Sequence, residues 1–392
     1  MHCIPIMRHR RGTLCSIVPP HMLRNLAQRG DEDDRRRAIA SLEWSQQPRT
    51  ERQALVMIAG PVTFPAMRKR RTVFDARHDE SLPGAIARGE GSPRTRDAAV
   101  NEAYDGAGRT YDFYRRVYGR RSVDDHALRI DSSVHFGDGF NNAHWNGRQM
   151  IYGDGDGKYF RPFTSALDVI AHELTHGVSQ YTAAFAYSGQ AGALSEHFSD
   201  VFGVLTKQYW LRQTAARADW LVGEGLFTSR VHGEAIRSMK APGTAYDDPV
   251  LGSDPQPAHM RDYVRTAGDD RGVHVNCGIP NHAFYRVATL LGGRAWETAG
   301  RIWYHALTRE LGPRSQFRHC ADATWRAAGE LFGAGSAPQE AVVAGWKSVG
   351  IDVSAALVRG GPRLPVRARR EKRDVFEPMT PGAETPHFDQ LA

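Results

Sequence analysis

From Thr164 onward, apolar residues recur every three or four positions, which is the spacing of an amphipathic helix. The first such run follows Thr164, where Ser165 and Asp168 have the spacing of a capping box. Its apolar positions are Leu167, Ile170, Ala171, Leu174 and Val178. The same spacing predicts later helices at 192–217, 279–291, 295–311, 316–332 and 338–348.

Shorter, alternating patterns fill the stretch between Thr72 and Thr164. Residues 128–131 and 149–152 alternate in the manner of strands, and the Gly-Asp-Gly-Asp-Gly run at 153–157 predicts a hairpin turn. We interpret its aspartates as turn residues, because the further acidic positions of a helix–loop–helix calcium site are missing. Before Thr72 the pattern predicts two short helices, at 22–28 and 33–42. The basic run 68–71 follows, which we expect to be an exposed, cleavable hinge.

Composition narrows the class of protein. The 392 residues are 41% hydrophobic and 24% charged, which suits a soluble protein of roughly two or three domains. No stretch approaches the roughly 18 apolar residues of a membrane helix, and the first 20 residues lack the apolar core of a secretory signal. The net charge of +7 comes from the two ends of the chain, so we expect no nucleic-acid partner. The cysteines, Cys3, Cys15, Cys277 and Cys320, have no metal-binding spacing, and whether Cys277 pairs with Cys320 stays open.

The helix predicted after Thr164 carries the run His172-Glu173-Leu174-Thr175-His176. Residues four apart lie on one face of a helix, so His172 and His176 can offer two imidazole nitrogens to one metal ion. Glu173 lies beside them, close enough to handle a metal-bound water without being a ligand. Two histidines at this spacing also occur on ordinary helices, so the interpretation requires a third ligand.

Glu196 is the candidate third ligand, in the next predicted helix. Two histidines and one glutamate leave the fourth zinc position for water, as catalysis requires. Asp200 falls one turn after Glu196 on the same face, where its carboxylate can accept an imidazole N–H and orient that ring. The sequence therefore predicts a catalytic zinc site.

With these residues in place, the sequence resembles the thermolysin family of neutral zinc metalloendopeptidases over about 72–355. The brief leader with its Pro-Pro-x-x-Leu element at 19–23 resembles the protealysin-like, short-propeptide branch. The resemblance implies an α+β fold with a β-rich N-terminal lobe and an all-helical C-terminal lobe. A central zinc-binding helix would join them, with the active-site cleft between. The implied divisions are a propeptide at 1–71, the β-rich lobe at 72–163, the central helix at 164–181, the helical lobe at 182–355 and a disordered basic tail at 356–392.

The resemblance also implies roles for individual residues. One catalytic Zn²⁺ would be held by His172, His176 and Glu196, with Glu173 as the catalytic base. His274 would stabilise the tetrahedral intermediate, with Asp269 as its partner and Tyr187 as a second donor to the oxyanion. Asn142 and the carbonyl of Ala143 would bind substrate backbone, and Arg237 would lie below the pocket for the residue after the scissile bond. Each could singly be a packing or surface residue, but their order and spacing relative to His172 make joint coincidence a poor explanation.

Some positions depart from the family pattern. Ser195 replaces the usual asparagine beside the second zinc histidine, and we expect its shorter side chain to need a bridging water. The family's double calcium site keeps Asp168, Asp219 and Glu224, but Lys207 and Leu221 replace two other acidic positions. Ca²⁺ therefore stays open as a cofactor, with an incomplete pair expected. Cys277, in place of a serine near His274, is expected to be a small buried thiol.

Two rival functions stay open. A zinc aminopeptidase shares the two-His, one-Glu set, but its acidic motif for the substrate's free amine is not seen upstream of His172. A non-catalytic binding protein with structural zinc would have no use for Glu173 or His274. We expect peptide or protein substrates cleaved before bulky hydrophobic residues, the propeptide as an intramolecular inhibitor, and a monomer. Secretion, implied by the family, and a cytoplasmic location both stay open.

Overall fold

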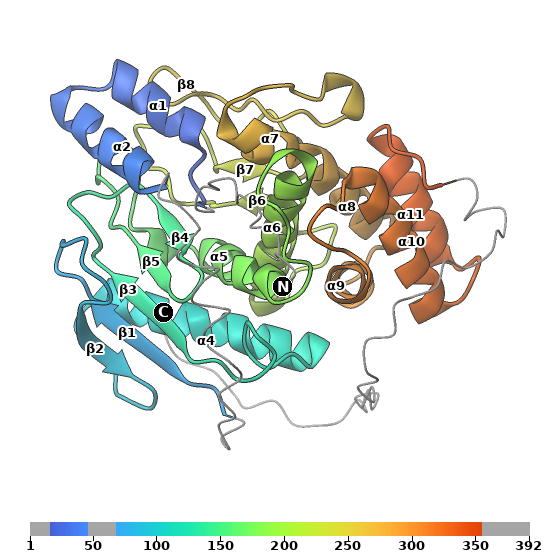
Figure 1. The fold of residues 1–392 in the computed structure, drawn as a ribbon, viewed down its shortest axis with the longest axis horizontal. Coiled ribbons are helices and arrows are strands. Elements are labelled where there is room, and N and C mark those ends of the chain that lie inside the picture. Colours follow the sequence, from blue (N-terminus) through green and yellow to red (C-terminus); the bar gives the residue numbers. More distant parts are fainter. Residues whose placement is uncertain (1–15, 46–67, 355–392) are drawn as a thin grey trace, which may run out of the picture.

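A five-stranded sheet forms the centre of the N-terminal lobe in the computed structural model, which describes residues 16–45 and 68–354 (Figure 1). Its strands are β1 (Arg71–Asp75), β2 (Ala85–Gly89), β3 (Ile130–Val134), β4 (Ala143–Trp145) and β5 (Met150–Tyr152). They run in the order β2-β1-β3-β5-β4. The three central strands β1, β3 and β5 are parallel, and the two edge strands are antiparallel to their neighbours. The carboxyl ends of three parallel strands therefore meet at one edge of the sheet.

A long helix that the sequence patterns did not predict, α4 (Ala98–Tyr118), packs on this lobe. Asp97 caps its first turn by accepting from the backbone N–H of Val100, and Gly119 ends it in a left-handed conformation. Glycines weaken the helical pattern of α4, yet Gly106 is needed where it crosses the next helix. A Cβ atom there would lie 2.4 Å from Ile170 Cδ1. Tertiary packing therefore overrides local propensity in α4.

The helix α5 (Leu167–Gln180) runs through the middle of the molecule and packs against α6 (Gly189–Leu211). The remaining helices of the C-terminal lobe are α7 (Asp269–Asn276), α8 (Gly278–Leu291), α9 (Ala299–Arg309), α10 (Phe317–Phe332) and α11 (Ala337–Ser348). All but α7 match predicted helices to within a few residues. The lobe also carries two short ribbons, β6 (Leu221–Val222) with β7 (Arg237–Ser238), and β8 (Asp247–Asp248) with β9 (Gly252–Ser253). Short 3₁₀ turns lie at η1 (Phe163–Ser165) and η2 (Met260–Asp262).

Two local predictions were wrong. The hairpin of the sheet turns at 146–149, between β4 and β5, and not at the glycine-rich run 153–157. In that run Asp156 accepts three successive backbone N–H groups, from 158 to 160. The capping box is also absent, because Ser165 belongs to η1 and its hydroxyl donates to the Pro162 carbonyl. Asp168 lies inside α5 and accepts from the backbone N–H of Gly223 instead.

Two helices of the leader, α1 (Pro20–Arg29) and α2 (Glu32–Ser45), lie against both lobes near β4 and β8 (Figure 1). In α1, Asn25 donates to the Leu251 carbonyl at 2.9 Å. In α2, Trp44 packs edge-on against Phe136, with ring centroids 4.7 Å apart. The predicted helices at 22–28 and 33–42 thus form, each slightly longer than predicted. The predicted disordered tail at 356–392 lies outside the described residues.

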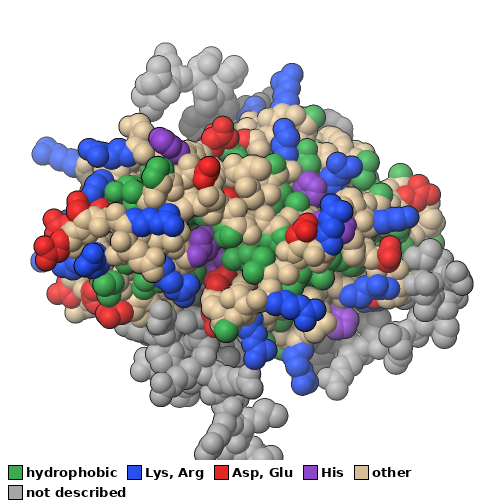
Figure 2. All heavy atoms as spheres, turned by 90° about the horizontal axis from the view of Figure 1, so that it is seen from above, with side chains coloured by type: hydrophobic (Ala, Val, Ile, Leu, Met, Phe, Trp, Pro, Cys, Tyr) green, Lys and Arg blue, Asp and Glu red, His purple; other side chains and the backbone are tan. Residues whose placement is uncertain are grey.

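Charges of both signs are interspersed on the face seen in Figure 2, without a broad basic surface. No helix among the described residues is both long and apolar enough to cross a bilayer. Cys277 and Cys320 are buried free thiols, so they do not staple the C-terminal lobe. Cys3 and Cys15 fall outside the described residues.

Candidate active site

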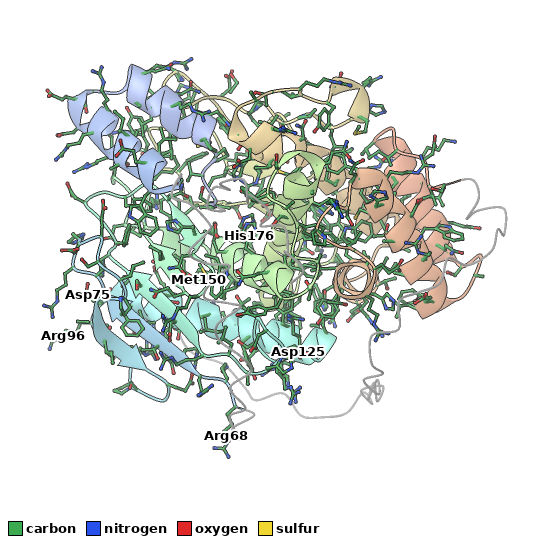
Figure 3. All side chains as sticks on the ribbon, in the orientation of Figure 1. Arg68, Asp75, Arg96, Asp125, Met150 and His176 are labelled. Carbon is green, nitrogen blue, oxygen red and sulfur yellow. The ribbon has the colours of Figure 1, made fainter. Side chains whose placement is uncertain are left out.

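Three side chains from α5 and α6 converge at the centre of the molecule, where His176 is labelled in Figure 3. His172 Nε2 lies 3.1 Å from His176 Nε2 and 3.5 Å from Glu196 Oε2, while His176 Nε2 lies 3.4 Å from Glu196 Oε1. All three residues are buried, and Glu196 Oε2 has no hydrogen-bond partner among the described residues. A buried carboxylate oxygen left bare beside two imidazole nitrogens fits a metal ion bound between them.

The close approach of α5 and α6 makes this convergence possible. Gly203 of α6 faces α5, and a Cβ atom there would lie 2.6 Å from the Asp168 carbonyl oxygen and 3.3 Å from His172 Cβ. Any larger residue would therefore push the helix that carries Glu196 away from the helix that carries the two histidines.

The outer ring nitrogens of both histidines are also held. His172 Nδ1 lies 2.8 Å from Asp200 Oδ1, as its position one turn after Glu196 predicted. His176 Nδ1 lies 3.2 Å from Ser195 Oγ, so the expectation that this serine needs a bridging water was wrong. Such contacts fix which nitrogen of each imidazole faces the metal position.

Glu173 lies beside the three converging groups without joining them. Its Oε2 accepts the backbone N–H of Trp145 in β4 at 2.9 Å, and its Oε1 has no hydrogen-bond partner among the described residues. Burial disfavours the charged form and raises the pKa of Glu173 to about 8. This carboxyl group can therefore both accept and release a proton near neutral pH.

His274, in α7, faces the same point from the opposite wall. Its Nδ1 pairs with Asp269 at 2.5 Å, and its Nε2 lies 3.2 Å from the Tyr187 hydroxyl and 3.6 Å from Glu196 Oε2. Burial alone would lower its pKa, but Asp269 and Glu196 outweigh burial and raise the pKa of His274 to about 9. Tyr187 also donates to Glu196 Oε1.

The turn that presents His274 has an unusual backbone. Asp269, Asp270, Arg271 and Gly272 all have positive φ, between 45° and 77°. Three of these four residues carry side chains that disfavour this conformation. The Asp269 carboxylate holds the turn by accepting from the backbone N–H and the ring of His274. Because the backbone of this turn is not helical, the residues of α7 do not show the regular helical spacing of apolar residues, and the sequence did not predict this helix.

The leader passes between the two lobes as a short non-helical segment before α1, with its backbone bent at residues 17 and 18. The Ser16 carbonyl lies 3.0 Å from His274 Nε2. The Ile17 N–H donates to the Ala143 carbonyl at 3.2 Å, and the Ile17 carbonyl accepts from Arg237 Nη1 at 2.9 Å. The next N–H, of Val18, donates to Asn142 Oδ1 at 3.0 Å. Four groups predicted for substrate or intermediate thus contact consecutive backbone groups of the leader.

Arg237 links the leader to the ligand cluster. It is buried, and its Nε and Nη2 donate to both oxygens of Asp200, at 2.9 and 2.8 Å. Asn281 donates to Asp200 as well, at 2.8 Å. Burial would raise the pKa of Asp200, but Arg237 and His172 hold it well below its usual range. Asp200 is therefore a carboxylate that orients His172 and Arg237 together.

Lys207 lies near the C-terminal end of α6, more than two turns after Glu196, where the family has its double calcium site. Its ammonium lies 3.0 Å from Asp219 Oδ1, 3.3 Å from Asp168 Oδ2 and 3.6 Å from Glu224 Oε2. It also donates to the Leu221 carbonyl at 3.0 Å. A side-chain cation thus lies among the three acidic groups that match the family's calcium positions.

Comparison with known proteins decides the family. Residues 69–180 match the thermolysin metallopeptidase catalytic domain, and residues 183–351 match the thermolysin metallopeptidase alpha-helical domain. The chain belongs to the thermolysin family. Within this family, it is 45% identical to an extracellular metalloprotease of Pectobacterium carotovorum subsp. carotovorum, over 87% of this chain and 97% of that protein. It is 39% identical to a thermolysin of Alicyclobacillus acidocaldarius subsp. acidocaldarius, over 71% of this chain and 50% of that protein.

The fold of this thermolysin-family chain matches a solved structure of the precursor of protealysin, a metalloproteinase from Serratia proteamaculans. The TM-score is 0.79 at 45% identity, covering 86% of this chain and 99% of that one. The chain is thus a thermolysin-like zinc metalloendopeptidase of the protealysin-like branch. The predicted β-rich N-terminal region and helical C-terminal lobe are confirmed.

Several residues that contact the active-site groups carry no signal in the sequence. Ser16, Ile17 and Val18 belong to no motif of their own, and only the Pro-Pro element after them marks where the segment before α1 ends. Asn281 also escaped notice, because an asparagine inside a predicted helix has no distinguishing pattern. It bridges Asp200 and His197, and burial lowers the pKa of His197 to about 4.

Proposed function

We propose that this zinc endopeptidase recognises the backbone of a peptide substrate through the groups that now contact the leader. The observation that carries the proposal is the match between three consecutive leader residues and the catalytic groups. The Ser16 carbonyl lies at His274, and the Ile17 N–H and carbonyl are bound by Ala143 and Arg237. These contacts support the proposal that the Ser16–Ile17 peptide bond lies at the position of a scissile bond.

Each residue has a distinct part in this proposal. Zinc held by His172, His176 and Glu196 would supply a Lewis acid that polarises the scissile carbonyl and acidifies water. Glu173 takes the proton from the attacking water and passes it to the leaving amine, through the Oε1 atom that has no hydrogen-bond partner among the described residues. His274 and Tyr187 donate to the developing oxyanion, and one such donor contributes about 3–4 kcal/mol in comparable sites.

The remaining residues position these groups. Asp269 keeps His274 oriented and protonated, while Asp200 and Ser195 hold the outer nitrogens of the two zinc histidines. Asn142, Ala143 and Arg237 align the substrate backbone. Because Ile17 follows the bond at the reacting position and is fully buried, the site is expected to prefer a bulky apolar residue there.

The leader acts as an intramolecular inhibitor in this proposal, because it fills the backbone sites a substrate needs. Its ion pairs and packing also bind it to both lobes, for example Lys158 with Asp31 and Asp34 at 2.8 and 2.6 Å. Arg71 is the first residue of β1, and Lys69 pairs with Asp112, so we place the processing site before Lys69. Incubation followed by intact-mass analysis tests this, since an active enzyme that retains its whole leader would contradict it.

The direct test of the catalytic assignment is Glu173→Gln. The variant is expected to keep one zinc ion, because Glu173 is not a ligand, and to lose cleavage of an N-blocked peptide. Casein digestion by the unmodified enzyme should stop with phenanthroline and return with added zinc. A variant that loses zinc yet cleaves normally would contradict the assignment of both the ligands and the base.

A further inference from the structure

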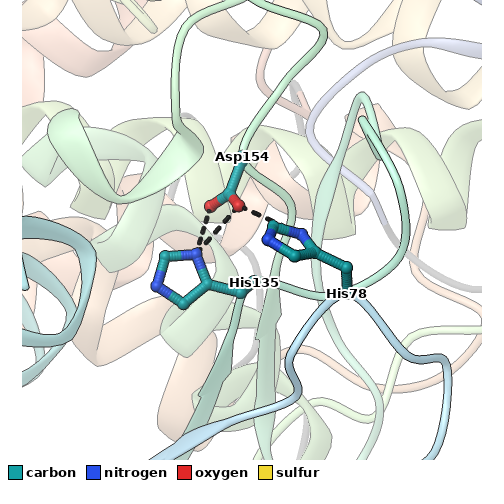
Figure 4. Close-up of side chains that lie close together, drawn as sticks. All are labelled: His78, His135 and Asp154. Carbon is teal, nitrogen blue, oxygen red and sulfur yellow. Dashed lines mark hydrogen bonds and ion pairs between the residues drawn. The ribbon is translucent and has the colours of Figure 1, made fainter.

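A second group of metal-binding side chains lies at the edge of the sheet where the three parallel strands end (Figure 4). His78 follows β1, His135 directly follows β3, and Asp154 follows β5. Neighbouring parallel strands present their carboxyl ends at one edge, so the fold brings together three residues that are far apart in sequence. None of them is part of the active site.

The separations lie on either side of the spacing expected for ligands around a small metal ion. Asp154 Oδ2 lies 2.8 Å from His135 Nδ1 and 3.6 Å from His78 Nδ1. Ligand atoms about 2.0–2.1 Å from a tetrahedral zinc ion would be about 3.3 Å apart, which falls between these two values. The three ligand atoms all lie within 4.8 Å of one another, as do those of His172, His176 and Glu196.

A second carboxylate supports the ring of His135 from its other side. His135 Nε2 lies 2.8 Å from Asp97 Oδ2, so an N–H on this nitrogen leaves Nδ1 with its lone pair facing Asp154 and His78. A carboxylate behind a metal-binding histidine fixes the tautomer and raises the basicity of the ligand. The backbone aligns the two histidines as well, because the His78 N–H donates to the His135 carbonyl at 2.7 Å.

The cluster opens to solvent through a hollow of about 510 Å³, which Asp97, His135 and Asp154 line together with Glu102 and Glu224. Water can therefore reach any coordination position that the protein leaves free. We propose that His78, His135 and Asp154 bind a second divalent transition-metal ion of the zinc class, with Asp97 as the group that orients His135. Imidazole and carboxylate donors suit this class of ion. The ion would join the loops that follow β1, β3 and β5.

A purely structural interpretation competes with this proposal. Without metal, His135 lies between two carboxylates, and the hydrogen bond to Asp154 raises its pKa to about 9. The ring would then be a cation that clips Asp97 and Asp154 together. That interpretation gives no role to His78, whose side chain is 60% exposed and 3.6 Å from Asp154. Substitution of His78 therefore distinguishes the metal-binding interpretation from the purely structural one.

The experiment measures zinc bound per chain at equilibrium by mass spectrometry, over a range of free zinc. The full-length Glu173→Gln protein, which should not digest itself, is expected to bind a second equivalent in addition to the catalytic one. His78→Asn and Asp154→Asn should lose this second equivalent and keep the first. Asp97→Asn should keep it with an affinity about 10- to 100-fold weaker, because it alters only the orientation of a ligand.

His305→Asn is the matched control, since His305 lies 3.0 Å from the Glu330 carboxylate in a simple histidine–carboxylate pair away from the sheet. It should leave both zinc equivalents in place. Thermal melts of protein already loaded with the catalytic zinc should show the same order, with a further zinc-dependent rise in Tm that His78→Asn abolishes and His305→Asn retains. One zinc per chain in the parent protein, or a second equivalent that survives His78→Asn, would overturn the proposal. Either result would leave the catalytic assignment unaffected.

Discussion

Lys207 gives the sharpest prediction, because a side-chain ammonium takes the place of a metal ion there. The perturbation is Lys207→Met, which keeps much of the side chain's length and removes its charge. Three carboxylates would then face one another without a cation. Asp168 is almost fully buried, Asp219 is 23% exposed and Glu224 is 53% exposed. Only the pairs of Lys207 with Asp168 and Asp219 are shielded enough from solvent to contribute substantially to stability, since exposed ion pairs contribute little.

The magnitude follows from the buried pair. Removing one partner of a buried ion pair destabilises a protein by about 3–5 kcal/mol. Asp168 keeps its hydrogen bond from Gly223, so we take the lower end, about 3 kcal/mol. At about 2–4 °C per kcal/mol for a domain of this class, Tm should fall by about 6–12 °C. The Tm of Lys207→Glu should fall further than that of Lys207→Met in EGTA. It should recover in millimolar Ca²⁺, because the new carboxylate is an acidic ligand in place of the cation.

The assay is a thermal melt in the Glu173→Gln background, in EGTA and in Ca²⁺. Lys69→Met is the control, because within the described residues Lys69 pairs with Asp112 alone, at 2.7 Å, and both side chains are about a quarter exposed. It should lose less than about 1 kcal/mol. Equal losses of stability in the two methionine variants would refute the role given to Lys207, and so would a gain in Tm from Ca²⁺ as large in the unmodified chain as in Lys207→Glu.

Three further predictions concern the cleft. Asp269→Asn should move the alkaline decline of kcat/KM to lower pH, because Asp269 raises the pKa of His274 and the active imidazolium is lost as pH rises through this pKa. An unchanged alkaline decline would contradict this role of Asp269. Tyr187→Phe should lower kcat/KM about 100-fold at unchanged zinc content, whereas loss of zinc would show that its hydroxyl serves mainly to hold Glu196. Ile17→Pro removes the N–H that donates to the edge strand, so mass spectrometry should show loss of the leader about 10-fold faster; equal rates would mean that this bond does not maintain latency.

The zinc cluster could be predicted from sequence because its geometry is local. His172 and His176 are four residues apart on one helix and therefore lie on the same face. Glu196 and Asp200 have the same spacing on the next helix. The long C-terminal helices were also predictable, because each buries one apolar stripe and keeps the helical period throughout.

Other features depend on contacts between distant segments, which no local pattern records. The segment of the leader before α1 binds groups more than a hundred residues away, such as Asn142 and Arg237. The cluster of His78, His135 and Asp154 exists only because parallel strands align their ends. The aspartate was interpreted as a turn residue, which describes its place in the chain but not its partners.

The sequence predicted neither helix α4 nor the turn before His274, because α4 has a weak helical pattern and the turn has an unusual backbone conformation. In α4, glycine and tyrosine blur the pattern, and packing against Ile170 supplies what propensity does not. In the turn, four residues from Asp269 adopt a left-handed backbone that sequence rules reserve mainly for glycine. The predicted Ser165 cap failed because a 3₁₀ turn precedes the helix.

The leader's grip on the cleft has a consequence for evolution and engineering of this enzyme. His274, Arg237, Asn142 and the Ala143 carbonyl are buried, and each now has a leader backbone group as a partner. When the leader departs, only water or another peptide chain can satisfy them, and a single amino acid offers too few groups to do so. A substitution at one of these four groups that weakens the hold on the leader is expected to weaken the hold on substrate through the same bonds. Latency can be changed separately from catalytic efficiency only by substitutions in the leader itself, as in Ile17→Pro or in α1 and α2.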